Sequence, residues 1–270
     1  MSSGREDASA SGLGRGFSHG RPALVTYLMA GYPDRATSMD AMQAAARAGA
    51  DVIELGVPYA DPLADGPVIV NAGAVAREAN EGGFGLAETL DLAAEFIAHP
   101  DVEVAPPVAL MTYLNPMMRL GFSKVAERAR EAGVSGFIVP DMPPDAARPW
   151  LAASAGLDTV FLVAPTSTPE RLAKVGQLSS GFVYCVSTTG ITGERTELSD
   201  ELADLVARVK EHTSLPVAVG FGVSTPEQAE TVAHVADGVI VGSAIVKRQD
   251  DVASLAAFVA DLAAAVHRSR

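Results

Sequence analysis

Short runs of β-branched and apolar residues alternate with alanine-rich amphipathic stretches along almost the whole chain. This alternation is typical of a parallel sheet whose strands are joined by right-handed crossover helices. The expected strands are Ala23–Met29, Val52–Val57, Val108–Thr112, Gly136–Pro140, Thr159–Val163, Phe182–Val186, Val217–Gly220 and Gly238–Val241. The expected helices are Ala36–Ala48, Leu86–Ala98, Ser123–Ala132, Pro144–Ala153, Pro169–Gln177, Leu198–Glu211, Pro226–His234 and Asp251–His267.

Eight strand-like runs fit either a closed (β/α)8 barrel or a doubly wound dinucleotide-binding sheet. The latter calls for GxGxxG after its first strand, whereas this chain continues with Ala30-Gly31-Tyr32-Pro33-Asp34. The 270 residues also suit one barrel of ~250 residues. We therefore expect an α/β protein with a single TIM barrel over residues 21–270. Residues 1–20, rich in Gly and Ser, are expected to form a disordered or weakly ordered tail.

Composition narrows the range of partners and compartments. The net charge of −13 argues against nucleic acid and anionic membranes, which are recognised by clustered Lys and Arg. A small anionic ligand remains possible because backbone N–H groups bind phosphate without net positive charge. One cysteine, Cys185, rules out an internal disulfide and fits a reducing cytoplasm. No apolar run approaches the ~20 residues of a membrane span. We expect a cytoplasmic protein.

The lysines and histidines argue against two classes of barrel enzyme, because barrel chemistry takes place at the carboxyl ends of the strands. The lysines fall on expected helices, with Lys247 assigned to a terminal helix, which disfavours a Schiff base. The histidines lie in the tail, at helix ends or at the C-terminus, which disfavours a zinc site. We predict no metal site, with Mg²⁺ on Asp61 and Asp65 as a weaker alternative.

Carboxylates remain as the candidates for acid–base chemistry. Glu54 stands inside a buried strand, where a carboxyl is costly unless it is paired or used. Asp65 follows in a loop punctuated by proline and glycine, where a turn-forming role is the alternative. Tyr27, Tyr113 and Tyr184 fall at or near strand ends and could equally be barrel filling. Asp141 is either a helix cap or a site residue, and Cys185 is interpreted as a small core residue.

Glycine-bearing turns follow the last three expected strands. They are Ser187–Gly193, Gly220–Ser224 and Gly242–Ala244. Barrels commonly bind phosphate with the loops after strands seven and eight, where glycine lets the backbone N–H groups approach closely. A phosphorylated substrate handled by carboxylates is compatible with a carbon–carbon lyase, an isomerase or an epimerase.

These residues together resemble one family, the α subunit of tryptophan synthase, from about Ala23 to Val246. The shared segments are Ala30–Pro33, Glu54–Pro58 with Asp61–Pro67, Met111–Tyr113 with Asn115-Pro116, Pro140–Pro143, Gly190–Gly193, Gly220–Gly222 and Val241–Val246. The resemblance implies retro-aldol cleavage of indole-3-glycerol phosphate to indole and glyceraldehyde 3-phosphate, in tryptophan biosynthesis.

The resemblance also implies a role for each site residue. Glu54 would carry the proton transfers and Asp65 would face the indole nitrogen. The predicted substrate-binding residues are Tyr27, Tyr113, Tyr184, Thr192, Gly193, Gly222, Val223, Gly242 and Ser243. Thr192 would lie in a loop that closes over the substrate.

The resemblance further implies a partner. Pro58 and Asp61 would contact a β subunit that carries pyridoxal phosphate, in an α2β2 heterotetramer, and this chain would need no cofactor of its own. Three features depart from the family pattern: the helix-poor N-terminus, Val70 in place of glutamine, and Tyr27 in place of phenylalanine. A stand-alone lyase that releases free indole, a non-catalytic α-like binding partner and a sugar-phosphate epimerase remain as alternatives.

Overall fold

The strands form a single parallel sheet that curls into a barrel. The computed structural model describes residues 12–80, 82–99, 105–186, 195–220 and 222–269, with only the backbone for 195–201. Within these ranges the strands are β1 (Ala23–Met29), β2 (Val52–Gly56), β3 (Val108–Met111), β4 (Gly136–Ile138), β5 (Asp158–Val160), β6 (Leu162–Val163), β7 (Val183–Val186), β8 (Val217–Gly220) and β9 (Gly238–Val241). Every pairing between them is parallel.

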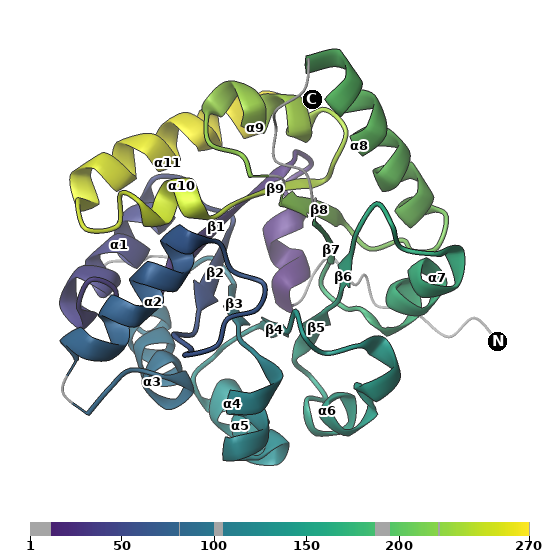
Figure 1. Cartoon of the computed structure of the whole chain (residues 1–270). Coiled ribbons are helices and arrows are strands. Elements are labelled where there is room, and N and C mark those ends of the chain that lie inside the picture. The colour runs from purple at the N-terminus through teal and green to yellow at the C-terminus, as the bar shows by residue number, and fades with distance from the viewer. Residues whose placement is uncertain (1–11, 81, 100–104, 187–194, 221, 270) are drawn as a thin grey trace.

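The order of the strands confirms the predicted (β/α)8 barrel. The sheet runs β5-β4-β3-β2-β1-β9-β8-β7-β6, and its two end strands are consecutive in the chain. The expected single strand Thr159–Val163 is thus two short pieces separated by Phe161. These two pieces together take the place of one strand, and the barrel closes around this interruption (Figure 1).

Helices surround the barrel on the outside (Figure 1). They are α1 (Arg35–Arg47), α2 (Pro67–Ala79), α3 (Leu86–Ile97), α4 (Leu114–Leu120), α5 (Phe122–Glu131), α6 (Arg148–Ala153), α7 (Pro169–Leu178), α8 (Arg195–Lys210), α9 (Pro226–Ala233), α10 (Ser243–Val246) and α11 (Val252–His267), with a 3-10 turn η2 (Pro144–Ala146). No helix in the described part of the chain is long and apolar enough to cross a membrane.

The sequence analysis did not predict α2, α4 or α10. The run Val68-Ile69-Val70 at the start of α2 has strand-like composition, but Pro67 stands at its first helical position, where its missing N–H costs nothing. The two other helices have seven and four residues, too few for a clear periodic pattern. All three helices lie next to the carboxyl ends of strands and therefore shape the rim of the barrel.

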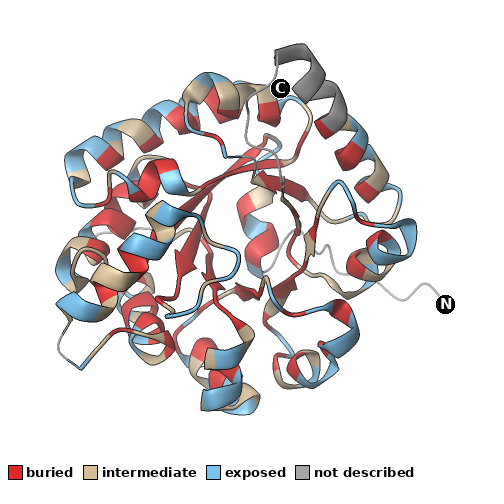
Figure 2. Cartoon of the chain, in the orientation of Figure 1, coloured by how far each residue is buried: buried red, intermediate tan, exposed pale blue. Residues whose placement is uncertain are grey.

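Two layers of apolar side chains hold the barrel together. The outer layer lies between the strands and the helices and includes Leu28, Ile53 and Leu110. The inner layer fills the barrel itself, with Val25, Val52 and Ile240 among its members. Figure 2 shows buried residues along the strands and on the inward faces of the helices. Alternate residues of each strand face the two layers, as the two-residue period of a strand requires.

A 3-10 helix, η1 (Gly12–Phe17), covers the bottom of the barrel. Leu13 is fully buried, and its N–H donates to the carboxylate of Asp158 at 2.7 Å. The Phe17 ring packs on Phe182 with 5.2 Å between ring centroids. Residues 12–17 thus differ from the weakly ordered tail expected for residues 1–20, since burial of Leu13 and packing of the partly buried Phe17 order a segment without helical periodicity. Residues 1–11 lie outside the described residues.

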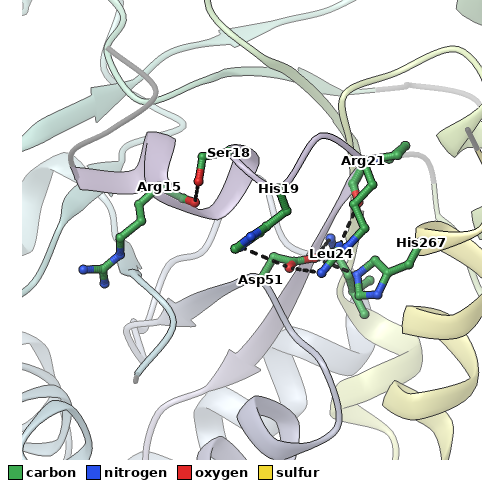
Figure 3. A network of polar contacts seen from close by, with 8 residues as sticks. Arg15, Ser18, His19, Arg21, Leu24, Asp51 and His267 are labelled. Carbon is green, nitrogen blue, oxygen red and sulfur yellow. Dashed lines mark hydrogen bonds and ion pairs between the residues drawn. The ribbon is translucent and has the colours of Figure 1, made fainter. Parts of the chain in front are cut away.

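Asp51 ties the C-terminal helix to the same end of the barrel (Figure 3). Arg21 donates to both of its carboxylate oxygens at 3.0 and 2.9 Å, and His267 Nε2 lies 2.8 Å from Oδ2. The N–H of Leu24 also donates to Oδ2, at 2.8 Å. Burial alone would raise the pKa of Asp51, but the bonds from His267, Arg21 and Leu24 outweigh it and hold the pKa below its ordinary value.

We therefore expect Asp51→Asn to lower the free energy of unfolding at pH 7 by about 3 kcal/mol, because it leaves Arg21 without its buried partner. A lowered folded-state pKa adds stability above the unfolded-state pKa, and this contribution is lost as the pH falls through the folded value. The difference between parent and variant should therefore shrink below about pH 4. Chemical denaturation of parent and variant at several pH values measures this difference in the free energy of unfolding.

Asp91→Asn is the matched control, because Asp91 pairs with Arg128 at 2.7 Å but is 63% exposed. It should cost less than about 1 kcal/mol at every pH. An equal loss of unfolding free energy in Asp51→Asn and Asp91→Asn would contradict the inference that Asp51 links α11 to the barrel.

Candidate active site

Glu54 is a buried carboxyl on the inner face of β2. Its exposed fraction is 2%, and its Oε2 has no hydrogen-bond partner among the described residues. Burial raises its pKa from 4.5 to about 8, and the nearby charge of Asp65 adds to the shift. At neutral pH Glu54 is therefore mostly a neutral acid with a proton to give.

Two tyrosines stand around Glu54 inside the barrel. Tyr27 is directly opposite Glu54 in the parallel pairing of β1 and β2, and Tyr184 comes from β7. Burial, and then the charges of the two acids, raise the pKa of both phenols well above the ordinary value. Both phenols consequently remain protonated and can donate hydrogen bonds. Gly56 makes room for Tyr27, since a Cβ there would lie 2.0 Å from the Tyr27 hydroxyl oxygen.

Asp65 belongs to the loop of residues 57–66, between β2 and α2. Burial raises the pKa of its carboxyl, while a hydrogen bond from the Tyr113 hydroxyl opposes the shift. The same hydroxyl oxygen accepts the N–H of Ala64 at 3.0 Å. Tyr113 is 1% exposed and does not line the cavity, so it supports Asp65 from behind. The sequence analysis had placed Tyr113 in the wall of the substrate pocket.

A cavity of about 630 Å³ opens at the carboxyl ends of the strands and contains both acids in its lining. This volume lies within the usual range for a small-molecule site. Part of the wall is apolar and could accommodate an aromatic ring. It comprises Ile69, Met111, Ile138, Leu162, Val186 and Ile240.

The glycine turns after β8 and β9 also line this cavity. Gly222, Val223, Gly242 and Ser243, which are predicted to hold a phosphate, all belong to its wall. Gly222 has a φ of +66°, a conformation that favours glycine. Ser243 starts α10, where the first N–H groups of a helix have no acceptor of their own. Thr192 and Gly193, which were predicted to bind substrate, lie outside the described residues.

Two basic residues at this end of the cavity were missed. Lys247 and Arg248 both line it, and neither makes an ion pair with another residue in the described ranges. The Arg248 guanidinium rests over the Phe258 ring at 4.0 Å. The sequence analysis assigned Lys247 to a terminal helix, which was wrong because α10 ends at Val246 and α11 begins only at Val252. Its position soon after the end of β9 was the sequence signal that could have placed Lys247 at the cavity.

Other singled-out residues lie away from the cavity. Pro58 is buried and Asp61 is exposed, both on loop 57–66. Asp141 accepts the N–H of Leu114 at 2.8 Å, at the first position of α4, and does not cap the 3-10 turn η2 that follows it in the chain. Cys185 is fully buried, and burial raises the pKa of its thiol to about 12. Among the described residues no three His, Cys, Asp or Glu side chains gather as a metal site would require.

The site therefore has two poles. One carries a protonated acid with a second acid nearby, and the other carries glycine turns with basic side chains at the rim. A ligand with an anionic end would bind at the second pole and present its remainder to the acids. The arrangement suits proton transfer to a bound molecule, because the acid is already neutral and shielded from water.

Sequence comparison identifies relatives over nearly the whole chain. The family model described as "Tryptophan synthase alpha chain" matches residues 15–268. The tryptophan synthase alpha chain of Synechocystis is 48% identical, covering 85% of this chain and 85% of its own length. That of Mycobacterium marinum is 45% identical and covers 97% of both.

Solved structures give the same result. A structure of Mycobacterium tuberculosis tryptophan synthase superposes with a TM-score of 0.84 at 44% identity, covering 95% of this chain and 98% of that chain. The alpha subunit of tryptophan synthase from Legionella pneumophila gives 0.84 at 31% identity, covering 99% of this chain and all of that one.

The buried acid should cost the fold stability at high pH. A raised folded-state pKa adds stability below the unfolded-state value, and that contribution is lost as the pH rises toward about 8. We expect Glu54→Gln to be nearly as stable as the parent at pH 5 but more stable by roughly 2–5 kcal/mol at pH 9, at ~1.4 kcal/mol per pKa unit. Urea unfolding at the two pH values measures this.

Glu127→Gln, which changes an exposed glutamate on α5, serves as the control and should show no such pH-dependent difference. A Glu54→Gln variant that is less stable than the parent at pH 9 would show that the carboxyl is ionised and compensated in the folded protein.

Proposed function

This chain belongs to the tryptophan synthase alpha chain family, and we propose that it cleaves indole-3-glycerol phosphate into indole and glyceraldehyde 3-phosphate. In this role it is the alpha subunit of tryptophan synthase in tryptophan biosynthesis. The reaction is a retro-aldol cleavage by a carbon–carbon lyase that works through carboxylate acid–base chemistry.

One observation carries this proposal. Glu54 is a neutral, buried acid whose Oε2 has no hydrogen-bond partner among the described residues, and it shares a cavity with glycine turns that suit a phosphate. The substrate has a basic ring carbon at one end and a phosphate at the other. Its two ends therefore match the two poles of the cavity.

The phosphate binds at the turns after β8 and β9. Backbone N–H groups of Gly222, Val223, Gly242 and Ser243 are offered to its oxygens, together with Gly193. Thr192 belongs to the loop that would close over the bound substrate. Lys247 at the rim offsets part of the phosphate charge. The indole ring then lies against the apolar wall beside Tyr27 and Tyr184.

Glu54 performs both proton transfers. It protonates C3 of the indole, which creates an indolenium that can accept electrons. The bond from C3 to the glycerol carbon breaks, and its electron pair returns to the ring. The hydroxyl on that carbon passes its proton back to the ionised Glu54 carboxylate, and the carbon becomes the aldehyde. Glu54 thus ends the cycle protonated, as it began.

Asp65 stabilises the charge that develops on the ring during this sequence. The indole N–H becomes more acidic as the indolenium forms, and a carboxylate that accepts its hydrogen bond lowers the barrier. The Tyr113 hydroxyl next to Asp65 favours the ionised form of this carboxyl. Because Asp65 faces charge that exists mainly in the transition state, its contribution falls on kcat.

The proposal includes a partner. A β subunit that carries pyridoxal phosphate would bind at loop 57–66, including Pro58 and Asp61, in an α2β2 assembly that receives the indole. Leu63 on this loop is 80% exposed and Met118 on α4 is 62% exposed, an unusual exposure for large apolar side chains. This chain would use no cofactor of its own and would act in the cytoplasm.

Indole release from indole-3-glycerol phosphate, followed by absorbance, tests the reaction. We expect the purified chain to release indole, and we expect Glu54→Gln to lower kcat by about 10²–10⁴-fold, the usual contribution of a positioned proton donor. Titration with a β subunit separates the alpha subunit from a stand-alone lyase, since only the former should be stimulated.

Glu127→Gln again supplies the control and should leave kcat unchanged. If Glu54→Gln released indole as fast as the parent, the carboxyl would not be the proton donor. If the parent chain released no indole even with the β subunit present, this chain would be a non-catalytic binding partner.

A further inference from the structure

Loop 57–66 holds Asp65 with little support from its own backbone. Within the described residues it makes one internal backbone hydrogen bond, from the N–H of Asp65 to the carbonyl of Pro62 at 3.4 Å. Asp61, Leu63 and Ala64 are exposed. Something outside the loop must therefore fix where the Asp65 carboxylate lies.

The segment that follows β3 provides this support. The Tyr59 ring stacks on the Tyr113 ring, with 5.3 Å between centroids and 29° between planes. The side-chain amide of Asn115 donates to the Tyr59 hydroxyl at 2.9 Å. Tyr113 in turn accepts the N–H of Ala64, and its hydroxyl lies close enough to the Asp65 carboxylate to lower the pKa of that carboxyl. The loop is thus held near both of its ends by two residues of one neighbouring segment, Tyr113 and Asn115.

The directions of these hydrogen bonds make the support specific. The Tyr113 hydroxyl has one proton, and because it accepts from Ala64 it is free to donate that proton to Asp65. The ring must keep one orientation for both bonds to exist. Tyr59 covers one face of that ring, and Asn115 holds Tyr59. Neither Tyr59 nor Asn115 lines the cavity.

We propose that Tyr59 and Asn115 are positioning residues, which act through Tyr113 to hold Asp65 at the indole nitrogen before any partner binds. This inference rests on the proposed function, because it assigns Asp65 its role there. Their effect on the reaction passes through Asp65 alone. It should appear in kcat rather than in KM, because Asp65 acts mainly on the transition state.

Single variants give the expected size of the effect. Tyr59→Phe keeps the stacked ring but loses the bond to Asn115, so kcat should fall by about 3–10-fold, as for one neutral hydrogen bond. Asn115→Ala removes the same hydrogen bond and should lower kcat by the same factor as Tyr59→Phe. The variant with both substitutions should have a kcat no lower than that of either single variant. Tyr59→Leu loses the ring stacking on Tyr113 as well, so we expect it to lower kcat by about 10–100-fold. Tyr32→Phe, at a tyrosine that is outside loop 57–66 and does not line the cavity, is the matched control.

The deciding experiment repeats Tyr59→Leu in an Asp65→Asn background, with indole release as the readout. If Tyr59 acts through Asp65, adding Tyr59→Leu to Asp65→Asn should change kcat by less than about 2-fold, because the Asp65 carboxylate that Tyr59 positions is already absent. A further 10-fold loss there, or a loss confined to KM in the wild-type background, would overturn the proposal.

Hydrogen exchange at the Ala64 amide measures, without any substrate, whether its hydrogen bond to the Tyr113 hydroxyl depends on Tyr59. We expect this amide to be protected in the full chain and in Tyr32→Phe, and to exchange at least 10-fold faster in Tyr59→Leu. An unprotected Ala64 amide in the parent chain would overturn the inference whatever the activity. A protected amide in a chain that releases no indole would instead count against the proposed function.

Discussion

A buried carboxyl group with an oxygen left unpaired among the described residues is the feature on which the rest of this structure depends. Glu54 stands in the interior of the barrel at 2% exposure, where an isolated carboxylate would be strongly disfavoured. The protein therefore holds it neutral, with a pKa raised to about 8. That neutrality is useful only because an apolar wall keeps water away and because Asp65 stands close by to raise the pKa further. The inner core of the barrel holds the carboxyl in place.

The barrel explains how residues far apart in sequence come to serve that carboxyl. Parallel strands all point their carboxyl ends to one rim, so the loop after β2 and the turns after β8 and β9 open into one cavity. The acids occupy one pole and the glycine turns the other. The opposite end of the barrel is closed by η1 and by the bonds of Arg21 and His267 to Asp51. Stability and chemistry are thus divided between the two ends.

Much of this could be predicted from the sequence, because strand composition and strand-end residues carry local signals. The bounds of β1, β8 and β9 were predicted as found, and the family resemblance is confirmed by relatives over most of the chain. Glu54 was recognisable because an acid inside an apolar strand has no packing explanation. The glycine turns were recognisable because they follow strands in register.

Other features have no local signal, since they exist only through tertiary contacts. The first turn of α2 has strand-like composition, and apart from Pro67 at its first position nothing local marks it as helical. η1 is ordered by burial of Leu13 rather than by helix propensity. Tyr59 looks like any loop aromatic until the β3 segment is placed beside it. Lys247 was assigned to the terminal helix although it lies between helices, because the four-residue α10 before it leaves no periodic pattern.

The central claim is that Glu54 is a neutral acid at neutral pH, and direct titration of its carboxyl tests this. Carbon-13 NMR of glutamate carboxyls from pH 4 to 10, with the signal of residue 54 assigned by its loss in Glu54→Gln, gives the midpoint. The account predicts a midpoint near 8. A midpoint near the ordinary 4.5 would contradict it, because the residue would then have no proton to deliver at neutral pH.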